Sequence, residues 1–389
     1  MTGVWPPWKG HRVLDASGAS GRQSVSRLAI AGLVLLQAVA FGTQSVLIAL
    51  SQKPWGGFAY DPSSAVVFTE VVKLVVALSS VVLNGQQRLL ALHPVAELPG
   101  PGGPSRSTSS GDGGLLGVLQ RSLVYALPAV LYVVHNNLIF VAHVYLSAPM
   151  YQLLSNLKII AAGVIFRFIL RRQLLVIQWM ALLQLAAGLA CSGFDDSAAG
   201  PALAGGRTRG PSAALVSSWH VGFLLVLLLA ICSALAVVYS ELLMKTSDLP
   251  VQVVSTWLHL YGVVASTMAY LATRQPGRSL LDGFTWLVWT LVLANGVLGF
   301  VVSFTFRHGG NSVKLYGASL AVPMTCAVSG PLLGQYSGSG FWLGYVQAIC
   351  ALCLFYGDQR MLCSIDADVV AGSAGGGLEQ EEAECPKMV

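Results

Sequence analysis

The 389-residue chain is poor in charged side chains. They make up 10% of its residues, against about 25% in soluble domains. A water-facing surface for 40.9 kDa cannot be built from so few charges, which excludes a large soluble enzyme. Nucleic-acid binding is excluded as well, because it needs a clustered basic face, whereas the 22 Lys and Arg residues are scattered along the chain.

Sequence motifs of catalysis and of metal binding are also missing. The chain contains no HExxH, no GxSxG, no P-loop and no dinucleotide-binding glycine fingerprint. Its seven cysteines form neither a paired framework nor a zinc pattern. We therefore expect the protein to be no enzyme and to hold no metal or cofactor.

The chain instead consists largely of apolar blocks, and hydrophobic residues make up 54% of it. A helix needs about 20 apolar residues to cross a bilayer. The blocks predict an all-α polytopic membrane protein with about ten transmembrane helices. We expect these spans at about 28–50, 64–83, 119–143, 150–170, 175–193, 219–243, 251–272, 284–306, 312–334 and 340–357.

Polar stretches divide the chain around this membrane domain. Residues 1–27 form a basic N-terminal segment, and residues 28–357 form the ten-helix domain, with halves at about 28–193 and 219–357. Residues 95–114 are rich in Pro, Gly and Ser, which is typical of a flexible loop. Residues 358–389 are Gly-rich and then acidic, which predicts a disordered tail.

The positions of the basic residues predict the orientation in the membrane. With both termini in the cytosol, 14 of the 22 Lys and Arg residues lie on the cytosolic side, five lie in the lumen and three lie within spans. Basic residues accumulate on the cytosolic side of membrane proteins. The asymmetry therefore favours an even number of spans with both termini cytosolic.

Polar residues recur after five spans. Asn137 is followed by Lys158 in the next span, and five spans later Asn295 is followed by Lys314. An odd number of spans per half inverts the second half relative to the first. The spacing therefore suggests two inverted five-helix repeats, the plan of many secondary transporters.

Three lysines, Lys73, Lys158 and Lys314, lie within spans, where a charged side chain costs at least about 2.5–3.5 kcal/mol. Lys158 lies about eight residues into its predicted span, with Tyr151 and Ser155 on the same helical face. Tyr132 and Asn136 form a similar pair in the preceding span. An aromatic ring, amides, hydroxyls and a cation suit a nucleotide, since lysine meets phosphate as a point charge.

The other candidate residues lie in the second and later spans. Lys314 begins the ninth span and faces small residues. Glu70 with Lys73, and Glu241 with Lys245, have helical spacing that allows each pair to neutralise itself. Tyr239 precedes Glu241 and lines the expected cavity.

Two GxxxG patterns flank the turn between the last two spans. They comprise Gly330 with Gly334 and Gly340 with Gly344. Such patterns let helices approach closely. They predict close packing of the last two spans and suggest a possible homodimer.

Four segments resemble those of the nucleotide-sugar transporter family, which includes the CMP-sialic acid and UDP-galactose transporters and belongs to the drug/metabolite transporter superfamily. The resemblance covers roughly residues 28–357. The segments are YVVHNNLIFVAHVYLSAPMYQLLSNLKII (132–160), PSSAVVFTEVVKL (62–74), SALAVVYSELLMK (233–245) and RHGGNSVKLYGAS (307–319).

This resemblance implies ten helices in two inverted halves and Golgi antiport of a cytosolic nucleotide sugar against a lumenal nucleoside monophosphate. It also implies roles for individual residues. Tyr132 and Asn136 would contact the base and ribose, and Asn137 is a further substrate-binding candidate beside them. Tyr151 would stack on or bond to the nucleotide. Lys158 and Lys314 would hold the phosphate, and Tyr239 would line the second half of the site.

The chain departs from the family pattern at two places. Many members have QNN where this chain has His135-Asn136-Asn137, and YQLK where it has Ser155-Asn156-Leu157-Lys158. These departures leave the sugar and the base open. The alternatives are a transporter of another phosphorylated metabolite or organic ion, and, from another class, a membrane-embedded enzyme or scaffold.

Overall fold

The computed structural model describes residues 27–53, 56–85, 122–168, 175–198, 212–246, 249–274, 277–308 and 310–357. The predicted N-terminal segment, the 95–114 loop and the C-terminal tail lie essentially outside these residues. The helices are α1 (Arg27–Leu50), α2 (Pro62–Leu83), η1 (Leu123–Tyr125), α5 (Ala126–Tyr145), α6 (Ala148–Leu154), α7 (Leu157–Phe168), α8 (Val176–Ala198), α9 (Ser212–Thr246), α10 (Val251–Thr273), α11 (Trp286–His308), α12 (Gly310–Leu333) and α13 (Ser339–Tyr356).

The described chain is all-helical, as predicted, and its only β-structure there is an isolated bridge between Gln52 and Phe58. Seven helices are long and apolar enough to cross a membrane. Helices also occupy the described parts of the other expected spans. The polytopic membrane class is therefore confirmed, while the count of ten spans in two inverted repeats stays a prediction.

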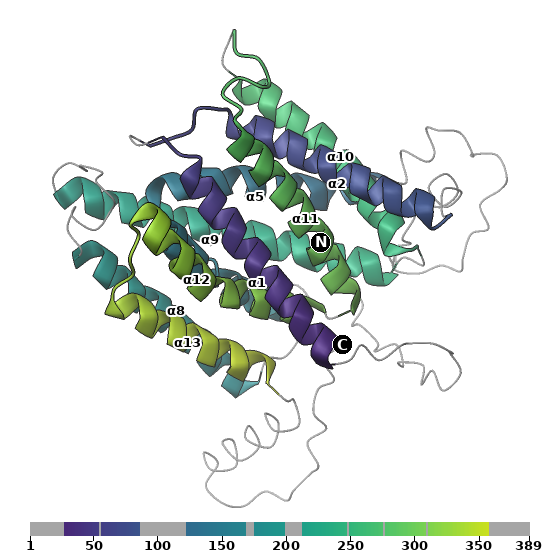
Figure 1. Ribbon diagram of the computed structural model, residues 1–389. Coiled ribbons are helices and arrows are strands. Elements are labelled where there is room, and N and C mark those ends of the chain that lie inside the picture. The colour runs from purple at the N-terminus through teal and green to yellow at the C-terminus, as the bar shows by residue number, and fades with distance from the viewer. Residues whose placement is uncertain are drawn as a thin grey trace, which may run out of the picture.

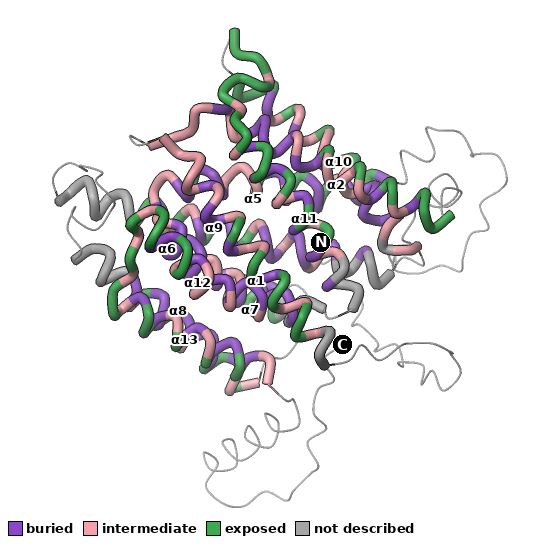
Figure 2. The backbone as a smooth tube through the Cα atoms, viewed as in Figure 1, coloured by how far each residue is buried: buried purple, intermediate pink, exposed green. Residues whose placement is uncertain are grey.

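The outer faces of the bundle are apolar. Leu183, Leu224, Met268 and Trp286 are between 61% and 78% exposed, and exposed residues follow the outer sides of the helices in Figure 2. A soluble monomer rarely exposes so much continuous apolar surface. These faces are the ones that lipid would cover.

Helices far apart in sequence form the main packing pairs, as Figure 1 shows for α8 with α13 and α2 with α10. The other large contacts join α1 to α12 and α5 to α9. Each of these four pairs combines one helix from the predicted first half with one from the second. Neither half could therefore bury its core alone.

Aromatic rings from the loops before α2 and α11 pack together with a ring of α5. Phe58 and Tyr60 follow α1, and their rings lie 5.4 Å apart. Phe58 is also 5.4 Å from Phe140 on α5, and Tyr60 is 5.8 Å from Phe284 before α11. Edge-on ring contacts at such distances are favourable. The loop before α2 is thereby fastened to the loop before α11.

The expected close packing of the last two spans is wrong. Gly344 of α13 faces Gly188 of α8 rather than α12, and a Cβ added at Gly344 would lie 2.5 Å from the Gly188 carbonyl oxygen. Gly330 faces Tyr336, and Gly334 adopts a positive φ of 65° at the end of α12. The GxxxG spacing allows a close approach but does not select the partner helix. The possible homodimer stays a prediction.

The Gly344 contact generates a stability prediction. Gly344→Ala should lower the free energy of unfolding by about 1–3 kcal/mol, because the added methyl group overpacks the α8–α13 contact. The measurement is thermal unfolding of the purified protein in detergent. Gly32→Ala is the control, since a Cβ there meets nothing within 4 Å. Equal melting temperatures for the two variants would contradict the close α8–α13 approach.

Candidate functional site

A break between α6 and α7 positions Lys158. Ser155 donates its hydroxyl to the carbonyl oxygen of Gln152 at 2.7 Å, and Asn156 donates its amide to that of Leu153 at 2.9 Å. Side chains of this kind compete with the helix for backbone hydrogen bonds. The backbone tightens accordingly, since the N–H of Lys158 bonds to the carbonyl three residues earlier, at 3.3 Å.

The prediction of one uninterrupted helix over 150–170 is therefore wrong. Tyr151, Ser155 and Lys158 do not share one continuous helical stripe. Tyr151 is 8% exposed, and its ring centroid lies 4.2 Å from that of His143. The hydroxyl of Ser155 is used on the backbone. Lys158 is instead the second residue of α7.

Two buried hydrogen bonds fasten this break to α12. The side-chain oxygen of Asn156 accepts from the Ser319 hydroxyl at 2.6 Å, and Gln152 donates to the carbonyl oxygen of Ala318 at 3.0 Å. Asn156 and Ser319 are both fully buried. The start of α7 therefore lies against the first half of α12, the part that carries Lys314.

The two lysines lie within electrostatic range of each other. Lys158 Nζ is 5.4 Å from the ring centroid of Phe41 on α1, and within the described residues no carboxylate lies at ion-pair distance from it. Lys314 is 9% exposed. Their charges repel each other, and both also act on His135. An anion between the lysines would relieve this repulsion.

A buried carboxylate forms the second part of the site. Glu70 on α2 is 3% exposed. It accepts from Lys73 at 2.9 Å, from His259 Nδ1 on α10 at 3.0 Å and from Asn136 on α5 at 3.3 Å. The predicted Glu70–Lys73 pair is thus confirmed and joins three helices. The side chains of Glu241 and Lys245 lie outside the described residues.

The remaining predicted residues differ in their surroundings. Tyr132 is half-buried on α5 and lies within electrostatic range of Glu70. The amide of Asn137 is engaged at both ends, since it accepts from Ser63 at 2.8 Å and donates to the carbonyl oxygen of Val133 at 2.9 Å. Tyr239 packs against a separate cluster that includes Trp257. The structure thus brings the lysines within electrostatic range of His135, which is next to Asn136 on α5, while Tyr239 packs in the cluster around Trp257.

Sequence reasoning missed His259 and the two bonds from the α6–α7 break to α12. His259 had a usable signal, because a lone titratable residue inside an apolar segment is a functional hypothesis. Asn156 and Ser319 had none, since their pairing over 163 positions depends on how the helices dock.

Comparison with known proteins identifies the family. The sequence model of the nucleotide-sugar transporter family matches residues 25–357. The chain belongs to the nucleotide-sugar transporter family. Members of this family are transporters rather than enzymes.

Individual relatives are similar over most of this transporter. "Probable UDP-sugar transporter protein SLC35A4" of Pongo abelii is 31% identical over 334 residues, which cover 84% of this chain and 94% of the relative. "CMP-sialic acid transporter 1" of Oryza sativa subsp. japonica is 31% identical over 251 residues, which cover 62% and 74%. A solved crystal structure with 14% identity aligns with a TM-score of 0.51 over 85% of this chain and 98% of its own, which supports the fold alone.

The Glu70 network generates a prediction about stability. Lys73→Met should cost about 3–5 kcal/mol, because it leaves a buried carboxylate with incomplete charge compensation. The double variant Glu70→Gln with Lys73→Met should recover part of that loss, since it removes the stranded charge. Thermal unfolding of both variants and of the wild type measures the difference. A double variant less stable than Lys73→Met would show that the carboxylate is not compensated by Lys73.

Proposed function

We propose that the protein is a Golgi antiporter that exchanges a cytosolic pyrimidine nucleotide sugar for a lumenal nucleoside monophosphate. The observation that carries this proposal is the pair of lysines, Lys158 and Lys314, held within electrostatic range inside an apolar bundle. Bringing two like charges together in a membrane interior is costly. A phosphate-bearing substrate offsets that cost for both.

The helix ends support the same site. Lys158 lies in the first turn of α7, and Lys314 is the fifth residue of α12. The N-terminal end of a helix carries partial positive charge and favours anions. Both lysines therefore stand where the backbone dipoles add to the attraction of a phosphate group.

The other predicted residues have different proposed roles, either contacting the substrate or forming the walls of the site. Tyr132 and Asn136 lie beside the charged cluster and are proposed to contact the base and ribose. Tyr151 is packed in the core, and the polar groups of Ser155 and Asn137 are engaged with the protein. We propose that these three, with Tyr239, shape the walls of the binding site.

The architecture proposed for exchange is ten spans in two inverted five-helix halves, with both termini in the cytosol. The four main packing pairs, which each join the two halves, support it. In such a plan one half rocks against the other around a central site. Relatives named as UDP-sugar and CMP-sialic acid transporters support the pyrimidine nucleotide sugar as substrate.

The lysine pair can be tested by nucleotide binding. Lys158→Ala and Lys314→Ala should each weaken the affinity for UMP or CMP by about 10–100-fold, since each removes a charged hydrogen-bond donor. Lys158→Arg should restore only part of it, because the donor geometry changes. Substrate-induced thermal stabilisation of purified protein, with UMP, CMP and GMP compared, measures the affinities.

Arg278→Ala is the matched control for this test, because it removes an exposed basic side chain outside the helices. It should bind like the wild type. Wild-type affinity in both Lys→Ala variants would make the lysines structural. Equal stabilisation by all three monophosphates would argue against a pyrimidine site.

The exchange mechanism can be tested in sealed Golgi vesicles that contain the protein. Vesicles preloaded with UMP or CMP should take up labelled nucleotide sugar several-fold faster than empty vesicles, because outward monophosphate flow drives uptake. Protease added outside should remove tags from both termini.

Each readout of the vesicle experiment has its own contradicting result. Equal uptake with and without preload would replace antiport by uniport. Protection of either tag would overturn the proposed orientation. Targeting to a membrane other than the Golgi, seen by co-fractionation with marker enzymes, would remove the proposed location.

A further inference from the structure

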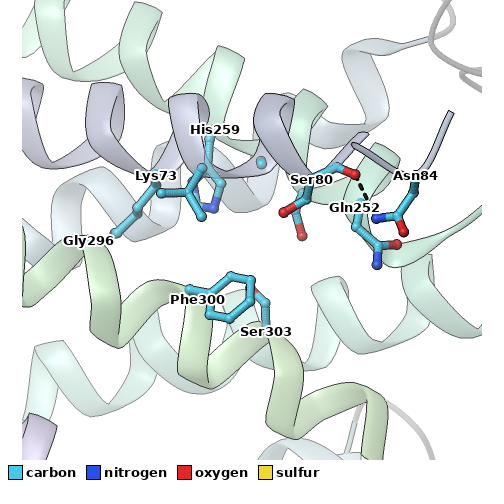
Figure 3. Close-up of a pocket in the computed structure, with 11 residues that line it drawn as sticks. Lys73, Ser80, Asn84, Gln252, His259, Gly296, Phe300 and Ser303 are labelled. Atoms are coloured by element: carbon cyan, nitrogen blue, oxygen red, sulfur yellow. Dashed lines mark hydrogen bonds between the residues drawn. The ribbon is translucent and has the colours of Figure 1, made fainter. Parts of the chain in front are cut away.

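A cavity of about 240 Å³ with several polar side chains in its lining lies between α2, α10 and α11. Figure 3 shows Lys73 and His259 at one end, Ser80, Asn84 and Gln252 at the other, and Phe300 with Ser303 facing them from α11. None of the eight predicted substrate-binding residues lines it. Pockets for drug-sized ligands measure about 300–1,000 Å³, so this cavity suits only a part of a nucleotide sugar.

The lining of the cavity offers hydrogen-bond acceptors. The side-chain oxygen of Gln252 is buried and has no partner. Asn84 uses its amide N–H on the carbonyl oxygen of Ser80 at 2.6 Å, and Ser303 uses its O–H on that of Gly299 at 3.0 Å. The oxygen of Asn84 and the lone pairs of Ser303 are therefore left to accept. A ligand with several hydroxyl donors complements such a lining.

The charged end of the cavity carries little spare charge. Lys73 and His259 both contact the Glu70 carboxylate, at 2.9 and 3.0 Å. The Glu70 carboxylate thus already compensates the charge of Lys73. No carboxylate is among the described residues that line the cavity. A ligand carboxylate would offer no donor to the partnerless Gln252 oxygen and would have to draw Lys73 away from Glu70.

The Glu70 network also connects the cavity to the proposed phosphate site. Glu70 accepts from Asn136 on its other side, and the neighbouring His135 lies within electrostatic range of Lys73, Lys158 and Lys314 together. A phosphate at the lysines and a sugar in the cavity would therefore lie on the two sides of the Glu70–Asn136 contact. The ring of Phe300 offers an apolar surface on which the C–H face of a sugar can lie.

We propose that this cavity holds the sugar of the transported nucleotide sugar, and that it accepts an uncharged hexose rather than an acidic sugar. The inference rests on the proposed function and names the substrate class of the same site. Gln252, Asn84 and Ser303 determine specificity by accepting hydrogen bonds from the sugar hydroxyls, while Glu70, which already engages Lys73 and His259, disfavours a sugar carboxylate.

Two ligands that differ only in the sugar test the charge preference. UDP-glucose carries a hydroxymethyl group where UDP-glucuronic acid carries a carboxylate. UDP-glucose should inhibit UMP uptake into proteoliposomes about tenfold more strongly, because its hydroxyl can donate to the buried, partnerless oxygen of Gln252 and a carboxylate cannot. Equal or stronger inhibition by UDP-glucuronic acid would overturn the proposal, as would a wild-type protein that binds CMP-sialic acid more tightly than CMP.

Two substitutions test the location of the sugar. The readout is the ratio of the affinities for UDP-glucose and UMP, since UMP lacks the sugar. Gln252→Leu and Ser303→Val should each reduce this ratio by about tenfold. Gln347→Leu is the matched control, because Gln347 also has a buried side-chain oxygen without a partner but lies on α13, outside the cavity. Its ratio should equal that of the wild type.

The results separate this inference from the proposed function. If the wild type binds neither UMP nor CMP, the proposed function itself fails. If it binds UMP and the ratio stays unchanged in both cavity variants, only the sugar site is wrong. A ratio that is unchanged while the variants lose their stabilisation by vesicles of anionic lipid would identify the cavity as a lipid site and overturn the proposal.

Discussion

The carboxylate of Glu70 is a charge placed inside an apolar bundle. Side chains from three helices contact it and compensate its charge. Lys73 comes from the same helix, His259 from α10 and Asn136 from α5. Gly262 on α10 leaves space for this carboxylate, because a Cβ at that position would lie 2.7 Å from a Glu70 oxygen. In a membrane interior such a group is retained only with nearby partners. The packing of α2 against α10 and α5 follows from this requirement.

The break between α6 and α7 also requires its polar groups to be hydrogen-bonded inside the protein. Its polar side chains bond to their own backbone and to α12, which satisfies them within the protein as a membrane interior requires. In exchange, the start of α7 is brought to the first half of α12. A continuous helix would have had no reason to place Lys158 near Lys314. The break in the helix is therefore what brings Lys158 near Lys314.

Much of the fold was predictable because lipid imposes simple rules. Apolar blocks of span length predicted helices whose bounds the structure reproduces within a few residues for most elements, as in α2 and α10. The Glu70–Lys73 pair was predictable from spacing alone, since residues three apart on a helix are neighbours. The partner of Gly344 was not, because glycine permits a close approach to any helix and the docking of α13 on α8 is a long-range event.

The sequence by itself determined the membrane class, the family and the presence of costly cations in apolar segments, since these follow from composition and from local periodicity. Only the tertiary structure decided which polar groups meet. It paired Asn156 with Ser319, brought His259 to Glu70 and left the oxygen of Gln252 facing a cavity. The physical reason is that side-chain contacts between helices depend on their rotation and depth relative to each other. No pattern within one helix specifies those two quantities.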